Sequence, residues 1–175
     1  MADKMVTGLF RDRDSAERAY GYLGPRGYTA DDVNVMMSDE TRRKYYGDTG
    51  KRVVQTELGT KALEGAGVGA GVGAVAGGAL AALAAAATIL IPGVGLVVAG
   101  PIAAALAGAG AGGVTGGIIG GLIGYGIPEE REKLYETGLK EGGIVLGVKP
   151  RNDEDADYFE REWKNTRGEH IYGPR

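Results

Sequence analysis

The chain has 175 residues, a formal net charge of −3 and no cysteine. This length suffices for one ordinary domain with a real core, or for a small domain with an appendage. The near-balanced charge argues against electrostatic capture of nucleic acid, and the missing cysteine excludes disulfides, thiolate nucleophiles and cysteine-ligated metals.

The N-terminal segment predicts a strand followed by a helix. MADKMVTGLF lacks the apolar run of a signal peptide, so the chain is expected to start in the cytoplasm. Met5–Phe10 within it is a short apolar, β-prone segment. The helix that follows would be capped by Asp14, with Glu17 as its capping-box partner, and would stop at Gly24-Pro25.

A second strand is predicted where apolar residues alternate in DVNVMM. Val33, Val35 and Met37 fall on one face of this segment, which is the pattern of a half-buried strand. Strand, helix and strand together form a β-α-β unit over residues 1–50. Residues 51–64 are expected to be a connector.

A block without charge follows, and we call Gly65–Pro128 the neutral block. Of its 64 residues, 20 are glycine and 18 are alanine, and none is Asp, Glu, Lys or Arg. A helix at the surface of a soluble protein would carry charge on its wet face. The neutral block has no such face, which favours burial in a bilayer or against other protein. A flexible Gly/Ala linker is the alternative, but the regular glycine spacing and the Leu and Ile content argue against it.

The neutral block predicts a helical hairpin over residues 65–127. Helix-breaking residues lie near its middle and are expected to form the hairpin turn: Pro92, Gly93 and Gly95. The arms would be Gly65–Ile91 and Leu96–Ile127. At about 1.5 Å per residue, either could cross the ~30 Å hydrocarbon core of a membrane.

Glycine recurs at every fourth position near the base of both arms. Such a row makes a flat groove in which another helix backbone can approach closely. Each glycine costs a helix about 1 kcal/mol relative to alanine, so close packing, a bilayer or both must offset the cost. The expected helix-packing and oligomerisation residues are Gly65, Gly69, Gly73, Gly77, Gly108, Gly112, Gly116, Gly120 and Gly124.

The sequence leaves two environments open for the hairpin. Only 8 residues of Ala66–Ile91 are Leu, Ile or Val, which is a weak insertion signal. The lack of charge favours insertion, whereas hairpins from several chains could also bury one another in a soluble assembly. If the outer segments form one domain, an even number of membrane crossings is required.

The C-terminal segment, residues 128–175, predicts helix, strand, helix and strand. Acidic residues after Pro128 open the first helix, and Ile144–Val148 is the strand. The second helix would be capped by Asp153, and HIYG would be the last short strand. The whole chain is therefore expected to be α+β: a ferredoxin-like domain, βαβ/αβαβ, split by the inserted Gly/Ala-rich helical hairpin.

Four short patterns suggest chemistry, and each has a simpler explanation. GVGAVA at Gly71–Ala76 follows no strand, and GDTGK at Gly47–Lys51 has the wrong spacing for a phosphate loop. NDEDAD at Asn152–Asp157 could gather cations, but acidic residues are also favoured in the first turn of a helix, which explains this run without a metal. His170 has no second histidine or cysteine with which to share a metal. No catalytic, cofactor-binding or metal-binding residue is therefore expected.

Three tyrosines lie near the expected base of the hairpin: Tyr45, Tyr46 and Tyr125. An aromatic ring there would suit a membrane interface. Packing against the ferredoxin-like domain is the alternative, and the sequence does not choose between them.

Most of the chain, roughly residues 5–172, resembles the bacterial general stress protein family with the YflT-type heat-induced domain. The most specific parts of the resemblance are IPGVG…AGP and GIPEE…Y…GGI. The resemblance implies a stress-induced bacterial protein with a glycine-zipper hairpin, and it brings no catalytic residues.

The sequence therefore predicts a non-enzymatic stress-response protein that self-associates through the hairpin. It would lie on the cytoplasmic side of the inner membrane, or in the cytoplasm as a large assembly. Its expected partners are itself, as a homo-oligomer, and the lipid bilayer, but not nucleic acid. A ferredoxin-like ligand-binding or sensory module is the other alternative, because such sheets often present a face to small ligands.

Overall fold

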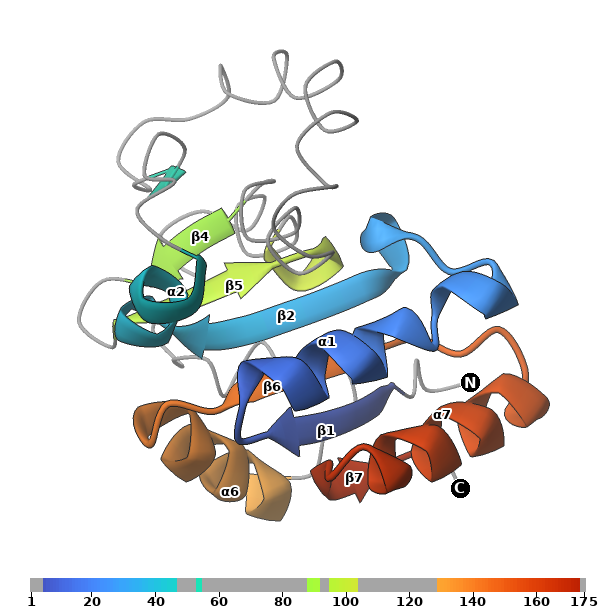
Figure 1. Ribbon diagram of the computed structural model, residues 1–175. Helices are drawn as coiled ribbons and strands as arrows, with labels where there is room; N and C mark the ends of the chain where they lie inside the picture. Colours follow the sequence, from blue (N-terminus) through green and yellow to red (C-terminus); the bar gives the residue numbers. More distant parts are fainter. Residues whose placement is uncertain (1–4, 47–52, 55–87, 92–94, 104–128, 174–175) are drawn as a thin grey trace.

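The computed structural model describes residues 5–46, 53–54, 88–91, 95–103 and 129–173 (Figure 1). These residues form a mixed α/β structure around one seven-stranded sheet, with the strand order β3-β4-β5-β2-β6-β1-β7. The strands are β1 (Val6–Phe10), β2 (Val33–Ser38), β3 (Val53–Val54), β4 (Thr88–Ile91), β5 (Leu96–Ala99), β6 (Ile144–Val148) and β7 (Glu169–Tyr172). The helices are α1 (Arg13–Gly21), α2 (Asp39–Tyr46), α6 (Glu129–Lys140) and α7 (Asp153–Asn165), with short 3-10 turns η1 (Gly24–Arg26) and η2 (Ala30–Asp32).

The predicted helix starts were wrong by one or two residues. The cap of α1 is Asp12 and not Asp14, because Asp12 keeps an extended backbone just before the first helical residue. Its carboxylate accepts the Ser15 backbone N–H at 2.8 Å, and this bond holds the pKa of Asp12 below its usual value. Likewise Asn152, and not Asp153, caps α7 through the backbone N–H of Asp155.

The N-terminal and C-terminal segments belong to one sheet. Strand β6 lies between β1 and β2 and pairs antiparallel with both, with Leu146 opposite Gly8 on one side and Val35 on the other. Strands β1 and β2 therefore run parallel, and α1 connects them across β6. Helix α7 connects β6 to β7 in the same way across β1.

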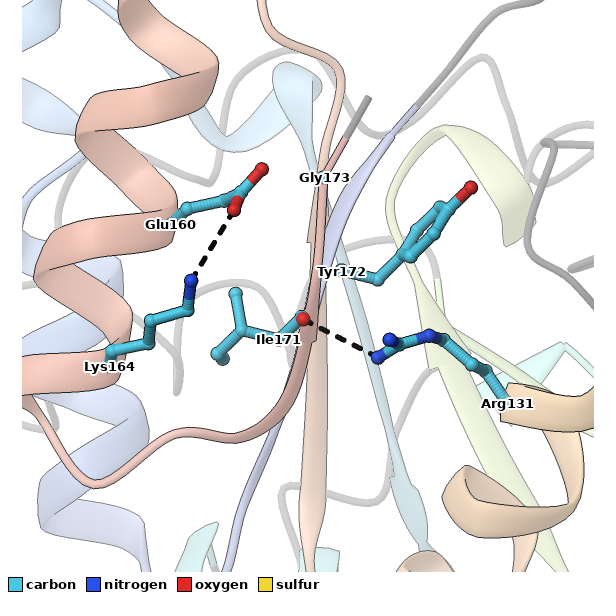
Figure 2. A pocket seen from close by; sticks show the side chains of 6 residues that line it. All are labelled: Arg131, Glu160, Lys164, Ile171, Tyr172 and Gly173. Carbon is cyan, nitrogen blue, oxygen red and sulfur yellow. Dashed lines mark hydrogen bonds and ion pairs between the residues drawn. The ribbon is translucent and has the colours of Figure 1, made fainter. Parts of the chain in front are cut away.

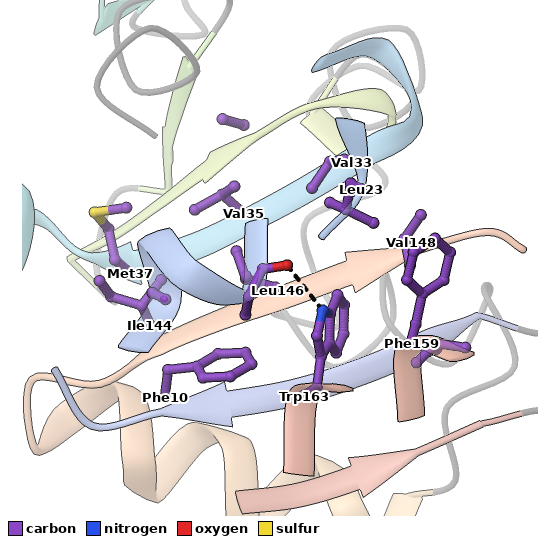
Figure 3. Packing of buried hydrophobic residues seen from close by; sticks show 14 of the residues in the cluster. Phe10, Leu23, Val33, Val35, Met37, Ile144, Leu146, Val148, Phe159 and Trp163 are labelled. Atoms are coloured by element: carbon purple, nitrogen blue, oxygen red, sulfur yellow. Dashed lines mark hydrogen bonds between the residues drawn. The ribbon is translucent and has the colours of Figure 1, made fainter. Parts of the chain in front are cut away.

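One face of the sheet packs against α1 and α7 (Figure 3). Phe10 meets Trp163 edge-on, with ring centroids 5.8 Å apart. The indole nitrogen of Trp163 donates to the carbonyl oxygen of Ala19 at 3.0 Å, so α7 is tied to α1 across this core. Aromatic pairs of this geometry add specificity to apolar burial.

The second face of the sheet is also covered, which corrects the expectation of a half-buried second strand. Val33, Val35 and Met37 do share one face of β2, but Asn34 and Met36 on the other face are 2% and 1% exposed. Met36 belongs to a second apolar cluster with Ile102, Ala103, and Tyr135 and Leu139 of α6, and Asn34 lies on the same face of β2. A strand covered on both faces loses the polar side that simple alternation predicts.

The centre of the neutral block is a β-hairpin in the structure. Strands β4 and β5 pair antiparallel, from Thr88 opposite Ala99 to Ile91 opposite Leu96. The prediction that helical arms continue through these residues was therefore wrong. This part of the block is rich in Ile, Leu and Val, and such short apolar runs fit a strand as well as a helix. Pairing of β5 with the edge of β2 selects the strand.

Candidate functional site at the seam between the block and the sheet

The neutral block joins the domain along the edge of β2, and we call this contact the seam. Strand β5 pairs antiparallel with β2, from Val35 opposite Ala99 to Ser38 opposite Leu96 (Figure 1). The backbone N–H of Asp39 also donates to the carbonyl oxygen of Gly95 at 2.8 Å. The seam thus begins at the turn before β5 and continues along the strand.

A buried asparagine extends the seam beyond β5. The side-chain oxygen of Asn34 accepts the backbone N–H of Ile102 at 2.7 Å. The side-chain nitrogen of Asn34 lies 3.9 Å from the Met5 sulfur, which is a weak acceptor. A polar group inside an apolar cluster stabilises only the arrangement that supplies its partner, so Asn34 selects one position for residues 101–103.

Gly100 allows the chain to turn closely past β2. Its φ is 99°, and a Cβ atom placed there would lie 2.1 Å from the carbonyl oxygen of Val33. Gly95 also has a positive φ, 65°, but a Cβ atom there would meet nothing within 4 Å. Both glycines serve a turn, and only Gly100 is required by close contact as well.

A shallow pocket of about 290 Å³ lies at the opposite end of the sheet, along β7 (Figure 2). Lys164 and Glu160 of α7 form an ion pair at 3.5 Å on one side of the strand, next to Ile171. On the other side, the guanidinium carbon of Arg131 lies 5.0 Å from the ring centroid of Tyr172. The charged groups of Arg131, Glu160 and Lys164 in this pocket already have partners within the protein.

The hydroxyl of Tyr135 links α6 to both β1 and β7 by hydrogen bonds. Its hydroxyl donates to the carbonyl oxygen of His170 at 2.7 Å. A phenol has one proton, so the hydroxyl of Thr7, at 2.8 Å, must be the donor in its bond to Tyr135. Tyr135 is fully buried, and this burial raises its pKa to about 12. It is therefore a neutral structural group and not a proton-transfer group near neutral pH.

A third polar cluster surrounds Asp155, in the first turn of α7. Its carboxylate accepts bonds from Arg26 at 2.9 Å and from the Tyr28 hydroxyl at 2.8 Å. The Tyr28 hydroxyl in turn accepts the backbone N–H of Arg151 at 2.7 Å. These bonds join the loop after α1 to the start of α7. Asp153, Glu154 and Asp155 of NDEDAD thus lie in the first turn of a helix, as predicted.

Most of the sequence-predicted packing residues lie outside the described residues. This applies to the whole glycine row, to Pro92 and Gly93 of the predicted turn, and to the GVGAVA and GDTGK patterns. Gly95 is described and lies between β4 and β5. His170 is exposed on β7, and within the described ranges no group of three or more His, Cys, Asp or Glu could hold a metal ion.

The two described tyrosines of the predicted hairpin base pack against the domain. Tyr46 is 8% exposed and belongs to the apolar cluster under α1, and Tyr45 packs against the same cluster. For these two residues, domain packing is the better of the two interpretations. Tyr125 lies outside the described residues.

The seam residues were missed by sequence reasoning. Asn34 interrupts the apolar run VNVMM, and Gly100 precedes a proline, so both carry a faint signal. Their partners lie far along the chain, and no local pattern points to them.

Comparison with known proteins identifies no relative: no family model, curated protein or solved structure matches the chain. In the part of the chain that the structure describes, no helix has both the length and the apolar character needed to cross a membrane.

Proposed function

We propose that this protein is a non-enzymatic stress-response protein that self-associates through its neutral block. The folded α/β domain would be the base from which the block extends. The observation that carries the proposal is the block itself, which has 64 residues without a charge and a regular glycine row. The seam supports it, because it is where the block meets the domain in the described residues.

The sheet limits how the block could enter a bilayer. Residues 5–46 and 129–173 form one domain, so the block leaves and returns on the same side. Strands β4 and β5 also return to this domain midway, which divides the remaining chain into residues 55–87 and 104–128. Residues 55–87 connect β3 to β4, and residues 104–128 connect the residues just after β5 to α6, so both stretches begin and end at the folded domain.

Chain length then favours association between copies over a spanning hairpin. Two crossings of a ~30 Å hydrocarbon core need about 40 helical residues. The two stretches have 33 and 25 residues, so neither could cross and return while β4 and β5 remain paired. Contact with a membrane would be confined to its surface, or would require the seam to open.

The arrangement of the outer segments supports a ferredoxin-like core. Within the order β2-β6-β1-β7, the β1-α1-β2 and β6-α7-β7 units each pass over one central strand. Strands β3, β4 and β5 would be an addition at the β2 edge. A stress-related role in bacteria remains a proposal that is based on the sequence resemblance.

A ligand-binding role for an open sheet face has less support. Every side chain of β1, β5 and β6 is buried, and so are those of β2 up to Met37. These four strands, covered on both faces, offer no ready surface to a small ligand.

Fractionation of cells that express the intact chain tests the proposal. Membranes are separated from cytosol and washed with carbonate, and the soluble fraction is sized without detergent. We expect a large, uniform, detergent-free species. Protein retained in washed membranes would contradict the closed-seam arrangement, and a soluble monomer would contradict self-association.

A matched pair of substitutions tests the glycine row. Gly116→Leu should block close helix approach and reduce the size of the assembly. Gly110→Leu makes the same change at a glycine outside the four-residue row, and it should have a smaller effect. Equal behaviour of the two variants would contradict the glycine-row mechanism.

A further inference from the structure

Strand β7 is one end of the described sheet. It pairs with β1 on one side and is the last strand of the described sheet order on the other. Its first two residues, Glu169 and His170, are exposed. An edge strand offers unpaired backbone N–H and C=O groups to another chain, so β7 is a place where a second copy could add a strand.

Two side chains of α6 donate hydrogen bonds to backbone carbonyl groups of β7. Arg131 donates from one nitrogen to the carbonyl oxygens of His170 and Ile171, at 3.3 and 3.4 Å (Figure 2). Its guanidinium also stacks over the ring of Tyr172. Tyr135, one helical turn further along α6, donates to the same His170 carbonyl oxygen. Two consecutive carbonyl groups of β7 are thus bound within the chain.

The strand is also distorted at this position. Thr7 pairs with Tyr172 and Leu9 with Glu169, so two residues of β7 stand opposite Gly8. This is a β-bulge, and His170 within it has a left-handed φ of 52°. Bulges interrupt the regular ladder and are a common protection of sheet edges.

We propose that Arg131 protects the β7 edge, and that without its contacts β7 pairs with the β7 of a second copy. A second copy is the relevant partner because self-association through the neutral block would hold other β7 strands at high effective concentration. This last step rests on the proposed function. The protection itself rests on the contacts of Arg131 with His170, Ile171 and Tyr172.

Cross-linking of the full-length chain tests the inference. The protein has no cysteine, so Glu169→Cys on β7 introduces a single thiol. A bismaleimide long enough to join neighbouring strands then reports contact between two β7 edges. Arg131→Met is added to remove the donors while keeping the aliphatic part over Tyr172. Lys133→Met is the matched control, because Lys133 is an exposed cation on the same helix.

We expect Arg131→Met to raise the yield of cross-linked dimer about fivefold, the factor that corresponds to one net hydrogen-bond contribution. Lys133→Met should stay at the level of the Glu169→Cys parent. Equal yields in all three proteins would overturn the inference. Each variant must match the parent in far-UV circular dichroism and melting temperature; if Arg131→Met does not, Arg131→Gln replaces it.

Sizing of the same samples separates the two proposals. If the parent is a monomer and Arg131→Met still cross-links more, the proposed self-association fails and the edge protection stands. If the parent is a large assembly and the cross-linking yield does not change, the edge protection fails and self-association stands.

Discussion

The side-chain oxygen of Asn34 accepts a hydrogen bond from the backbone N–H of Ile102 at 2.7 Å, and the two residues are 68 positions apart in the sequence. This bond joins the core strand β2 to the chain just after β5. Together with the β2–β5 pairing, it fixes where the neutral block meets the folded domain. The same block that looks independent in sequence contributes Leu96, Val98 and Ile102 to the core.

Replacement of Asn34 by leucine should loosen the seam. Asn34→Leu keeps the side-chain size but leaves the buried N–H of Ile102 without its acceptor, at a cost of roughly 1–3 kcal/mol. Hydrogen exchange should show faster exchange for amides of β5, while amides in the β1–β6 pairing stay protected and serve as the internal control. Unchanged protection of β5 would mean that strand pairing alone holds the seam.

The two turn glycines of the seam should respond differently to alanine. In Gly95→Ala the added methyl group faces open space, so the loss of stability should be only that of an alanine in a left-handed conformation, about 1–2 kcal/mol. Gly100→Ala adds a clash with the Val33 carbonyl oxygen and should cost more by roughly 1–3 kcal/mol. Chemical unfolding of both full-length variants measures the difference. Equal losses would show that residues 100–103 move away from β2 without penalty.

Tyr135 should make the protein sensitive to high pH. Burial raises its pKa from 10.0 to about 12, so the folded state keeps the phenol proton after the unfolded chain has lost it. Stability from this group is therefore complete below about pH 10 and is lost as pH rises toward about 12, by up to about 1.4 kcal/mol per pH unit. Burial also raises the pKa of Tyr46, which adds to the loss.

The variant Tyr135→Phe isolates this contribution. At neutral pH it should be less stable by roughly 1–3 kcal/mol, because the His170 carbonyl oxygen and the Thr7 hydroxyl lose their partner. Unfolding curves measured at increasing pH should then converge with those of the parent. A constant difference up to about pH 12 would show that Tyr135 does not titrate with a raised pKa.

Asp155 should contribute more to stability than a neighbouring acid on the same helix. Asp155→Ala leaves Arg26 and the Tyr28 hydroxyl without their buried acceptor, at a cost of roughly 1–3 kcal/mol. Asp157→Ala is the matched control, because Asp157 is exposed, and its effect should stay within about 0.5 kcal/mol. Thermal unfolding compares the two. Similar losses of stability in the two variants would mean that the negative charge near the helix start, and not the hydrogen bonds of Asp155, stabilises the protein.

Local patterns predicted the outer elements well. The apolar run at Met5–Phe10 became β1, and Ile144–Val148 became β6 with the same bounds. The predicted second helix of the C-terminal segment became α7, which buries Ala156, Phe159 and Trp163 in the core. These predictions succeeded because each depends on residues that are near one another in sequence.

The β-hairpin within the neutral block shows where local patterns fail. Thr88–Ile91 and Leu96–Ala99 can be read as helix or strand, since short apolar runs fit both. Pairing of β5 with the edge of β2 decides the question, and that edge is supplied by residues more than fifty positions earlier. No signal inside the block contains this information.

By itself, the sequence determined the order and type of the outer helices and strands except α2, which it did not predict, the lack of charge in the neutral block and the position of its central break. These properties follow from side-chain periodicity and composition, which are local. Only the tertiary structure decided that β6 joins both halves, that both faces of β2 are buried, and that Asn34 meets Ile102. Those relationships depend on contacts between distant residues, whose stabilisation exists only after the chain has folded.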